Sequence, residues 1–195
     1  MSIDLAKTVS HRYTGETVTF LETATETNGS HLLIEVKLPP HGDGPPLHTH
    51  DVFTESFECI AGQLTLKYQT NKNEIHLKAG ETFTAPIATP HTFLNRASEE
   101  LIFRVKLTPP RHFEESMRIH YGLMNDGLTD KKGNPKSIAH TALILTLQNT
   151  RIVGIPIKLQ RLIFDKIVRK NLKKGKYQSL EKYIGKPIAD LEIFG

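Results

Sequence analysis

Strand-like segments in the first 110 residues and helical periodicity in the rest predict an all-β jelly-roll barrel with C-terminal α-helices. The first observation is a series of short segments, rich in Val, Ile, Thr and Phe, in which apolar and polar residues alternate. The second is the pair Pro109-Pro110, after which the spacing of apolar residues lengthens from two to nearly four. Many short strands at such spacing are typical of two packed antiparallel sheets. We therefore predict a barrel domain over residues 1–110 and a helical extension over residues 111–195 that packs on it.

The predicted strands follow one another with turn-forming sequences between them. They cover residues 17–24, 31–38, 55–60, 63–69, 74–77, 81–84, 91–95 and 101–107. The Gly- and Pro-rich segment 39–46 is expected to form a loop, and the segments 71–73 and 79–80 are expected to form tight turns.

Four helices are predicted after the barrel. They cover residues 111–123, residues 137–147 with Ser137 as the N-cap, a segment that begins at Pro156, and residues 179–184. In the third helix one side is apolar and basic residues flank it; the apolar residues are Leu159, Leu162, Ile163, Ile167 and Val168. We expect this side to pack on the chain's own domain or on a partner subunit. A basic amphipathic helix that lies on a membrane surface is the alternative.

Basic charge is concentrated in the last 45 residues. Residues 1–150 hold 14 Lys and Arg against 17 Asp and Glu, whereas residues 151–195 hold 11 against 4. A solvated basic surface on the terminal helices explains this excess, and contact with an anionic surface is the alternative. No recognition motif accompanies the charge, so we expect no nucleic-acid partner.

Cysteine usage and hydropathy indicate where the chain works. A single cysteine excludes an intramolecular disulfide and indicates a reducing compartment, so a cytoplasmic location is expected. The N-terminal sequence resembles no secretory signal, and no apolar stretch has the length of a membrane-spanning helix.

Three histidines and a glutamate stand at spacings that suit one metal ion. His48 and His50 are two residues apart, so both side chains leave the same face of an extended strand. Glu55 begins the next strand on the face shared by Phe57, where an ionised carboxylate needs a nearby cation. His91 begins a later strand. Such a ligand set suits a divalent Fe, Mn, Co, Ni, Cu or Zn ion and suits Ca or Mg poorly.

Two stretches of the chain resemble the two sequence motifs of the cupin superfamily. The first is Gly42-x5-His48-x-His50-x4-Glu55-x6-Gly62, and the second is Gly80-x5-Pro86-x-Ala88-x2-His91-x3-Asn95. The single departure is Ala88, where the family pattern has glycine. An alanine would be strained there if the backbone needs a positive φ. The resemblance covers about residues 30–108 and implies a metal-binding cupin barrel, with His48, His50, Glu55 and His91 as ligands and a homodimer as the assembly.

The resemblance also implies a small-molecule ligand and a class of chemistry. We expect a metal-dependent enzyme of dioxygenase type that acts on an apolar or phenolic compound. Glu55 is the predicted catalytic base, in a role similar to that of the matching glutamate in cupin flavonol dioxygenases. Phe57, Cys59 and Phe93 are the predicted substrate-binding residues. A cupin isomerase or lyase, and a non-catalytic module that binds metal or ligand, remain the alternatives.

Overall fold

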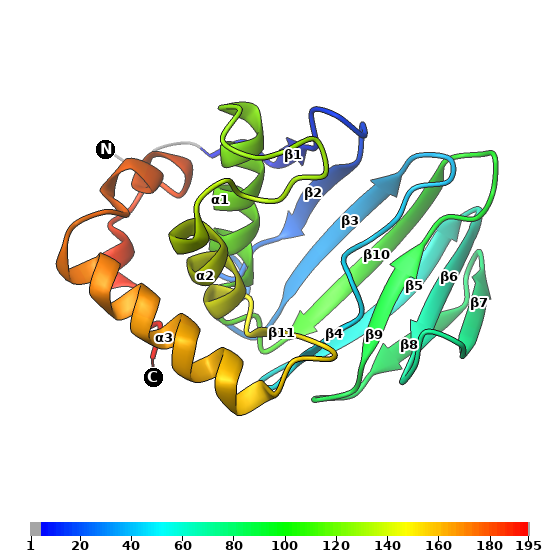
Figure 1. Ribbon diagram of the computed structural model, residues 1–195. Coiled ribbons are helices and arrows are strands. Elements are labelled where there is room, and N and C mark those ends of the chain that lie inside the picture. The colour runs from blue at the N-terminus through cyan, green and yellow to red at the C-terminus, as the bar shows by residue number, and fades with distance from the viewer. Residues whose placement is uncertain (1–4, 195) are drawn as a thin grey trace.

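The computed structural model describes residues 5–194 and shows the predicted two-sheet barrel followed by helices (Figure 1). The first sheet contains six strands in the spatial order β1 (Thr8–Ser10), β2 (Thr17–Glu22), β3 (Leu32–Leu38), β10 (Leu101–Thr108), β5 (Thr54–Ala61) and β8 (Thr82–Ala85). The second contains five, in the order β11 (Thr150–Ile152), β4 (His48–His50), β9 (His91–Leu94), β6 (Gln63–Tyr68) and β7 (Glu74–Lys78). Every pairing is antiparallel. The chain thus forms an all-β jelly roll with a helical C-terminal part.

The barrel core follows from the alternation of side chains along the strands. On β5, Glu55, Phe57 and Cys59 are buried between the sheets, while the residues between them are partly exposed. Glu58 therefore points away from the interior, as the alternation predicts. The buried set that surrounds β5 is almost wholly aliphatic and aromatic, and it extends over both sheets. An ionisable side chain on the inner face of β5 is consequently held in apolar surroundings.

The helices form a second apolar core beside the barrel. They are α1 (Phe113–Asn125), α2 (Ile138–Leu147), α3 (Ile157–Lys173) and the 3-10 helices η1 (Gln178–Tyr183) and η2 (Ile188–Asp190). Figure 1 shows α2 between α1 and α3, with α3 at the outer edge of the molecule. Ser137 takes the N-cap position of α2 as predicted, but its side chain makes no capping hydrogen bond. Among residues 5–194, no helix is both long and apolar enough to cross a membrane.

The first half of the third helix does not pack its apolar side on the chain's own domain, and packing on a partner subunit stays a prediction. Leu159, Leu162 and Ile163 are exposed, whereas Val168 is buried. The residue that packs inward in the first turns is Gln160, whose side chain bonds to the backbone N–H and C=O of Ile152. These hydrogen bonds compensate the burial of a polar side chain and rotate the apolar residues outward.

Two short strands were not predicted. β1 adds an edge to the first sheet, and β11 adds an edge to the second. β11 lies between two helices in the sequence, yet it pairs with β4, with Thr150 opposite His50 and Ile152 opposite His48. A segment beyond residue 110 therefore takes part in a barrel sheet.

Candidate metal centre

His48, His50, Glu55 and His91 meet between the two sheets. The histidines come from neighbouring strands of one sheet, β4 and β9, in which His48 is directly opposite His91. Glu55 comes from β5 in the facing sheet. All four side chains are buried, and one potential ligand atom from each lies within 4.8 Å of the others. The residues predicted as ligands therefore form a cluster that could hold one metal ion.

Each imidazole is oriented by a hydrogen bond from its Nδ1 atom to a backbone carbonyl. His48 donates to Pro46 (2.8 Å), His91 to Thr89 (2.8 Å) and His50 to Gln148 (3.1 Å). In this tautomer the Nε2 atoms of His48 and His50 present lone pairs to the centre of the cluster, whereas the Nε2 atom of His91 is bonded to Glu55. Orientation of ligating histidines by such outer hydrogen bonds is usual in metal sites.

The ring of His50 provides a direct test of whether the cluster suits a metal ion. Its Nε2 atom is buried and has no hydrogen-bond partner. The nearest carboxylate oxygen, Oε2 of Glu55, is 3.6 Å away, because that oxygen is bonded at 2.5 Å to Nε2 of His91. A buried imidazole nitrogen without a partner is costly unless it binds something. An ion at the centre would satisfy it, so the residues present fit a divalent transition metal.

The charges of the four side chains are strongly coupled. Burial lowers the pKa of His48 to about 3, with His50 and His91 adding to the effect. Burial also lowers the pKa of His50. Burial alone would raise the pKa of Glu55, but the histidines outweigh it and lower this pKa to about 2. His91 differs, because its hydrogen bond and ion pair with Glu55 outweigh burial and raise its pKa. Two histidines are thus neutral and ready to bind, and the third shares a proton with the carboxylate.

Metal binding is therefore expected to release a proton from His91 near neutral pH. The Nε2 atom of His91 cannot bind an ion while it carries a proton, so the proton and the ion compete. Because the pKa of His91 is raised, the apparent metal affinity should fall about tenfold for each pH unit below that pKa and level off above it. Titration calorimetry in two buffers of different ionisation enthalpy measures the released proton. Equal heats in both buffers at neutral pH would contradict the expectation.

Ala88 has a strained backbone conformation and is hydrogen-bonded to β4, the strand that carries His48 and His50. Its φ is +60°, in the left-handed region that glycine favours, and its N–H donates to the carbonyl of His50 at 2.7 Å. The sequence predicts strain here if a positive φ is required, and the structure shows that it is required. A side chain at this φ costs roughly 1 kcal/mol.

Glycine at position 88 is expected to stabilise the protein. Relief of the left-handed strain, less the extra entropy of glycine in the unfolded chain, gives a net gain of about 0.5 kcal/mol in the free energy of unfolding. The matched control is Ala85→Gly on β8, which is buried and should lose about 1 kcal/mol. Chemical denaturation measures both variants. A loss of stability in Ala88→Gly would show that the αL conformation carries no strain.

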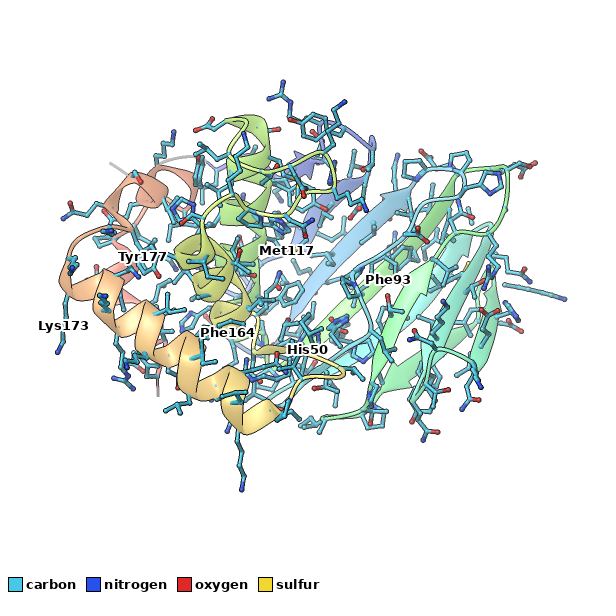
Figure 2. The ribbon with its side chains drawn as sticks, in the orientation of Figure 1. His50, Phe93, Met117, Phe164, Lys173 and Tyr177 are labelled. Atoms are coloured by element: carbon cyan, nitrogen blue, oxygen red, sulfur yellow. The ribbon has the colours of Figure 1, made fainter. Side chains whose placement is uncertain are left out.

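The segment after α2 is also hydrogen-bonded to β4 and its end, and this contact was not predicted from the sequence. Besides the bond from His50 to Gln148, the side chain of Asn149 accepts the N–H of Asp51 at 2.8 Å. Figure 2 shows His50 at the end of the barrel that faces the helices. The available signal was the β-branched sequence around Thr150, which is atypical of a helix-to-helix connection.

The predicted substrate-binding residues lie at different depths. The ring of Phe57 is fully buried with its centroid 6.0 Å from that of His91, and Phe93 is 6.4 Å from Phe57. Cys59 is buried further along β5, about 13 Å from Glu55 at roughly 3.3 Å per residue. Its thiol lies 3.6 Å from the carbonyl of Gly62, and burial raises its pKa. Phe57 therefore borders the ligand cluster, and Cys59 lies apart from it.

Comparison with known proteins gives a family match for the barrel part of the chain. Residues 34–107 match the family model of the Cupin domain. No curated protein matches the chain. Solved structures with a similar fold include a double-stranded beta-helix protein from Klebsiella pneumoniae, with 23% identity over 47% of this chain and 74% of that one, and a TM-score of 0.40. Another is a predicted oxalate decarboxylase from Thermotoga maritima, with 21% identity over 48% of this chain and 80% of that one, and a TM-score of 0.43. A third is the polyketide cyclase RemF from Streptomyces resistomycificus, with 18% identity over 54% of this chain and 70% of that one, and a TM-score of 0.43. The family match and the four-residue cluster of the two motifs identify residues 34–107 of this chain as a cupin domain.

Proposed function

We propose that this protein is a metal-dependent enzyme of dioxygenase type that acts on an apolar or phenolic small molecule. The observation that supports the proposal most is the unpartnered Nε2 atom of His50 within a cluster of four buried ligand residues. Three imidazole nitrogens and one carboxylate suit a redox-active first-row ion such as Fe, Mn, Co, Ni or Cu, and also Zn. Such an ion would supply Lewis acidity and a site where substrate and dioxygen meet.

The surroundings of the cluster support an apolar or aromatic substrate. Phe57 and Phe53 pack against the rings of His91 and His50, with centroid distances of 6.0 and 4.4 Å. Phe93 extends the aromatic surface toward the barrel interior. These rings exclude water from the ligand side chains and offer faces against which a phenolic ring can stack.

In the proposed reaction Glu55 accepts a proton from the substrate. The carboxylate is ionised at neutral pH, and loss of the hydrogen bond from His91 to its Oε2 atom, one cause of its pKa of about 2, would make it a stronger base. A phenol or enol hydroxyl placed at the cluster can donate to the same carboxylate in place of His91. His48 and His50 stay neutral and hold their orientation through their Nδ1 bonds.

Oxygen consumption by metal-loaded protein tests the proposal. We expect turnover with members of a panel of phenols and 1,3-diketones, and we expect His48→Ala to abolish it. The matched control is His76→Ala, because His76 is an exposed histidine of the edge strand β7, outside the cluster. Turnover of a substrate without oxygen consumption would indicate a cupin isomerase or lyase. Metal binding with no turnover of any compound would favour a non-catalytic binding module.

A further inference from the structure

An exposed apolar surface covers the start of α3 and the turn before it. Among residues 5–194, ten large apolar side chains are exposed, and six of them lie within the eleven residues 153–163. They are Val153, Ile155, Ile157, Leu159, Leu162 and Ile163. Leu162 is the most exposed of the ten, at 68%. We call these six residues the apolar patch. Such a concentration is unusual on a surface that only contacts water.

The same outward face of α3 becomes basic beyond the apolar patch. Lys166, Lys170 and Lys173 follow Leu159 and Leu162 at helical spacing and are exposed. Figure 2 shows Lys173 on the outer side of the helix and Phe164 on the side that faces α2. Asp165, which is partly buried, is the one acidic residue of α3. The face thus combines an apolar end with a row of lysines and carries no exposed carboxylate of its own helix.

We propose that this face docks the protein on an anionic lipid bilayer. The apolar patch would enter the boundary between headgroups and acyl chains, and the lysines would lie against anionic headgroups. The turn formed by Val153, Gly154 and Ile155 projects apolar side chains ahead of the helix and can enter first. The lysines can extend their aliphatic stems along the bilayer while their ammonium groups stay in water.

Charge favours a bilayer over a second copy of this chain as the occupant. A two-fold dimer through the apolar patch would leave the lysine row uncovered if the two copies of α3 ran antiparallel, and would bring the two rows together if they ran parallel. Like charges brought together in this way oppose association, whereas an anionic membrane attracts all of them. The excess of 11 basic over 4 acidic residues in the segment 151–195 acts in the same direction.

Sedimentation of the full-length protein with lipid vesicles tests the proposal. We expect the protein to bind vesicles of phosphatidylcholine with phosphatidylserine, to bind phosphatidylcholine alone weakly, and to be released by high salt. The triple variant L159Q/L162Q/I163Q should reduce the partition coefficient at least about tenfold. The triple variant K166Q/K170Q/K173Q should reduce it by about fivefold per lysine.

Two matched controls separate this face from general apolarity and charge. Ile138 is exposed to 66%, nearly as much as Leu162, so Ile138→Gln should leave vesicle binding unchanged while Leu162→Gln weakens it. The variant K72Q/K106Q/K132Q loses the same net charge as the α3 lysine variant, from exposed positions elsewhere, and should bind like wild type. Circular dichroism on heating checks that every variant is folded, which is expected because all the substituted side chains are exposed.

Three results would overturn the proposal. One is wild-type protein that stays in solution with phosphatidylserine vesicles at low salt. Another is a loss of vesicle binding in the control lysine variant that equals the loss in the α3 lysine variant, because net charge alone would then explain the binding. The third is a dimer in solution that Leu162→Gln converts to a monomer, with no vesicle binding by either, because the apolar patch would then belong to a second copy.

Discussion

Replacement of His91 by alanine is expected to remove metal from the protein. Wild-type protein purified without added metal should contain about one equivalent of a first-row transition ion, and the variant should retain almost none. His91 is one of the four predicted ligands and also bonds to Glu55, so we expect the metal affinity to fall by more than the roughly 10- to 100-fold that is typical of the loss of an outer-shell partner. Elemental mass spectrometry gives the metal content.

The same ion should stabilise the wild-type protein toward heat. At a free concentration about one hundred times its Kd, a metal that binds only the folded state contributes about 2.7 kcal/mol. For a chain of this size that corresponds to a rise in Tm of roughly 5–10 °C. His91→Ala should show no such rise, and His76→Ala, at an exposed histidine outside the cluster, should show the full rise. Wild-type protein that is free of metal and refuses added metal would contradict the metal centre itself.

Replacement of Asp51 by alanine is expected to destabilise the fold by about 3 kcal/mol, the size typical when one partner of a buried ion pair is removed. Asp51 directly follows β4, and its Oδ2 atom lies 3.6 Å from Nε of Arg151 and 3.1 Å from Nη2 of Arg161. Arg151 is only 4% exposed, and its Nε atom makes no hydrogen bond. Without the carboxylate its charge would be buried and unpaired. Chemical denaturation measures the loss.

The control for this prediction is Glu74→Ala. Glu74 pairs with Arg96 on the surface, where the side chain of Arg96 is half exposed, so its loss should cost less than about 1 kcal/mol. Asp51→Ala should also weaken metal binding, because the ion pair between Asp51 and Arg151 helps to hold β11 beside β4, the strand of His48 and His50. Equal losses in the free energy of unfolding for the two variants would mean that the ion pair between Asp51 and Arg151 adds nothing to the stability of the fold.

The four ligand residues could be predicted because their arrangement depends on local rules. Two-residue alternation alone places His48 beside His50 and turns Glu55 inward, and the spacing of the second motif brings in His91. Strain at Ala88 followed from one departure in that motif. The fold class was accessible for the same reason, since alternating strands and helical periods are local patterns.

The contacts made by the chain beyond residue 110 follow no such local rule. β11 has three residues, too few for a periodic signal, and its partner β4 lies about one hundred residues earlier. Leu159 and Leu162 do not pack on the chain's own domain as one alternative expected, because the hydrogen bonds of Gln160 to Ile152 outweigh their preference for burial there. The division of the chain at residue 110, the homodimer and the cytoplasmic location stay predictions.

The pairing of β4 with β11 also sets an order of events during synthesis. His48 and His50 leave the ribosome early, but the strand that borders them, and the carbonyl of Gln148 that orients His50, come about one hundred residues later. A nascent chain that has reached only residue 110 has all four ligand side chains and lacks this support. Completion of the metal centre therefore waits for the last quarter of the chain, so premature release would yield a barrel with its ligands but without the neighbour of its ligand strand.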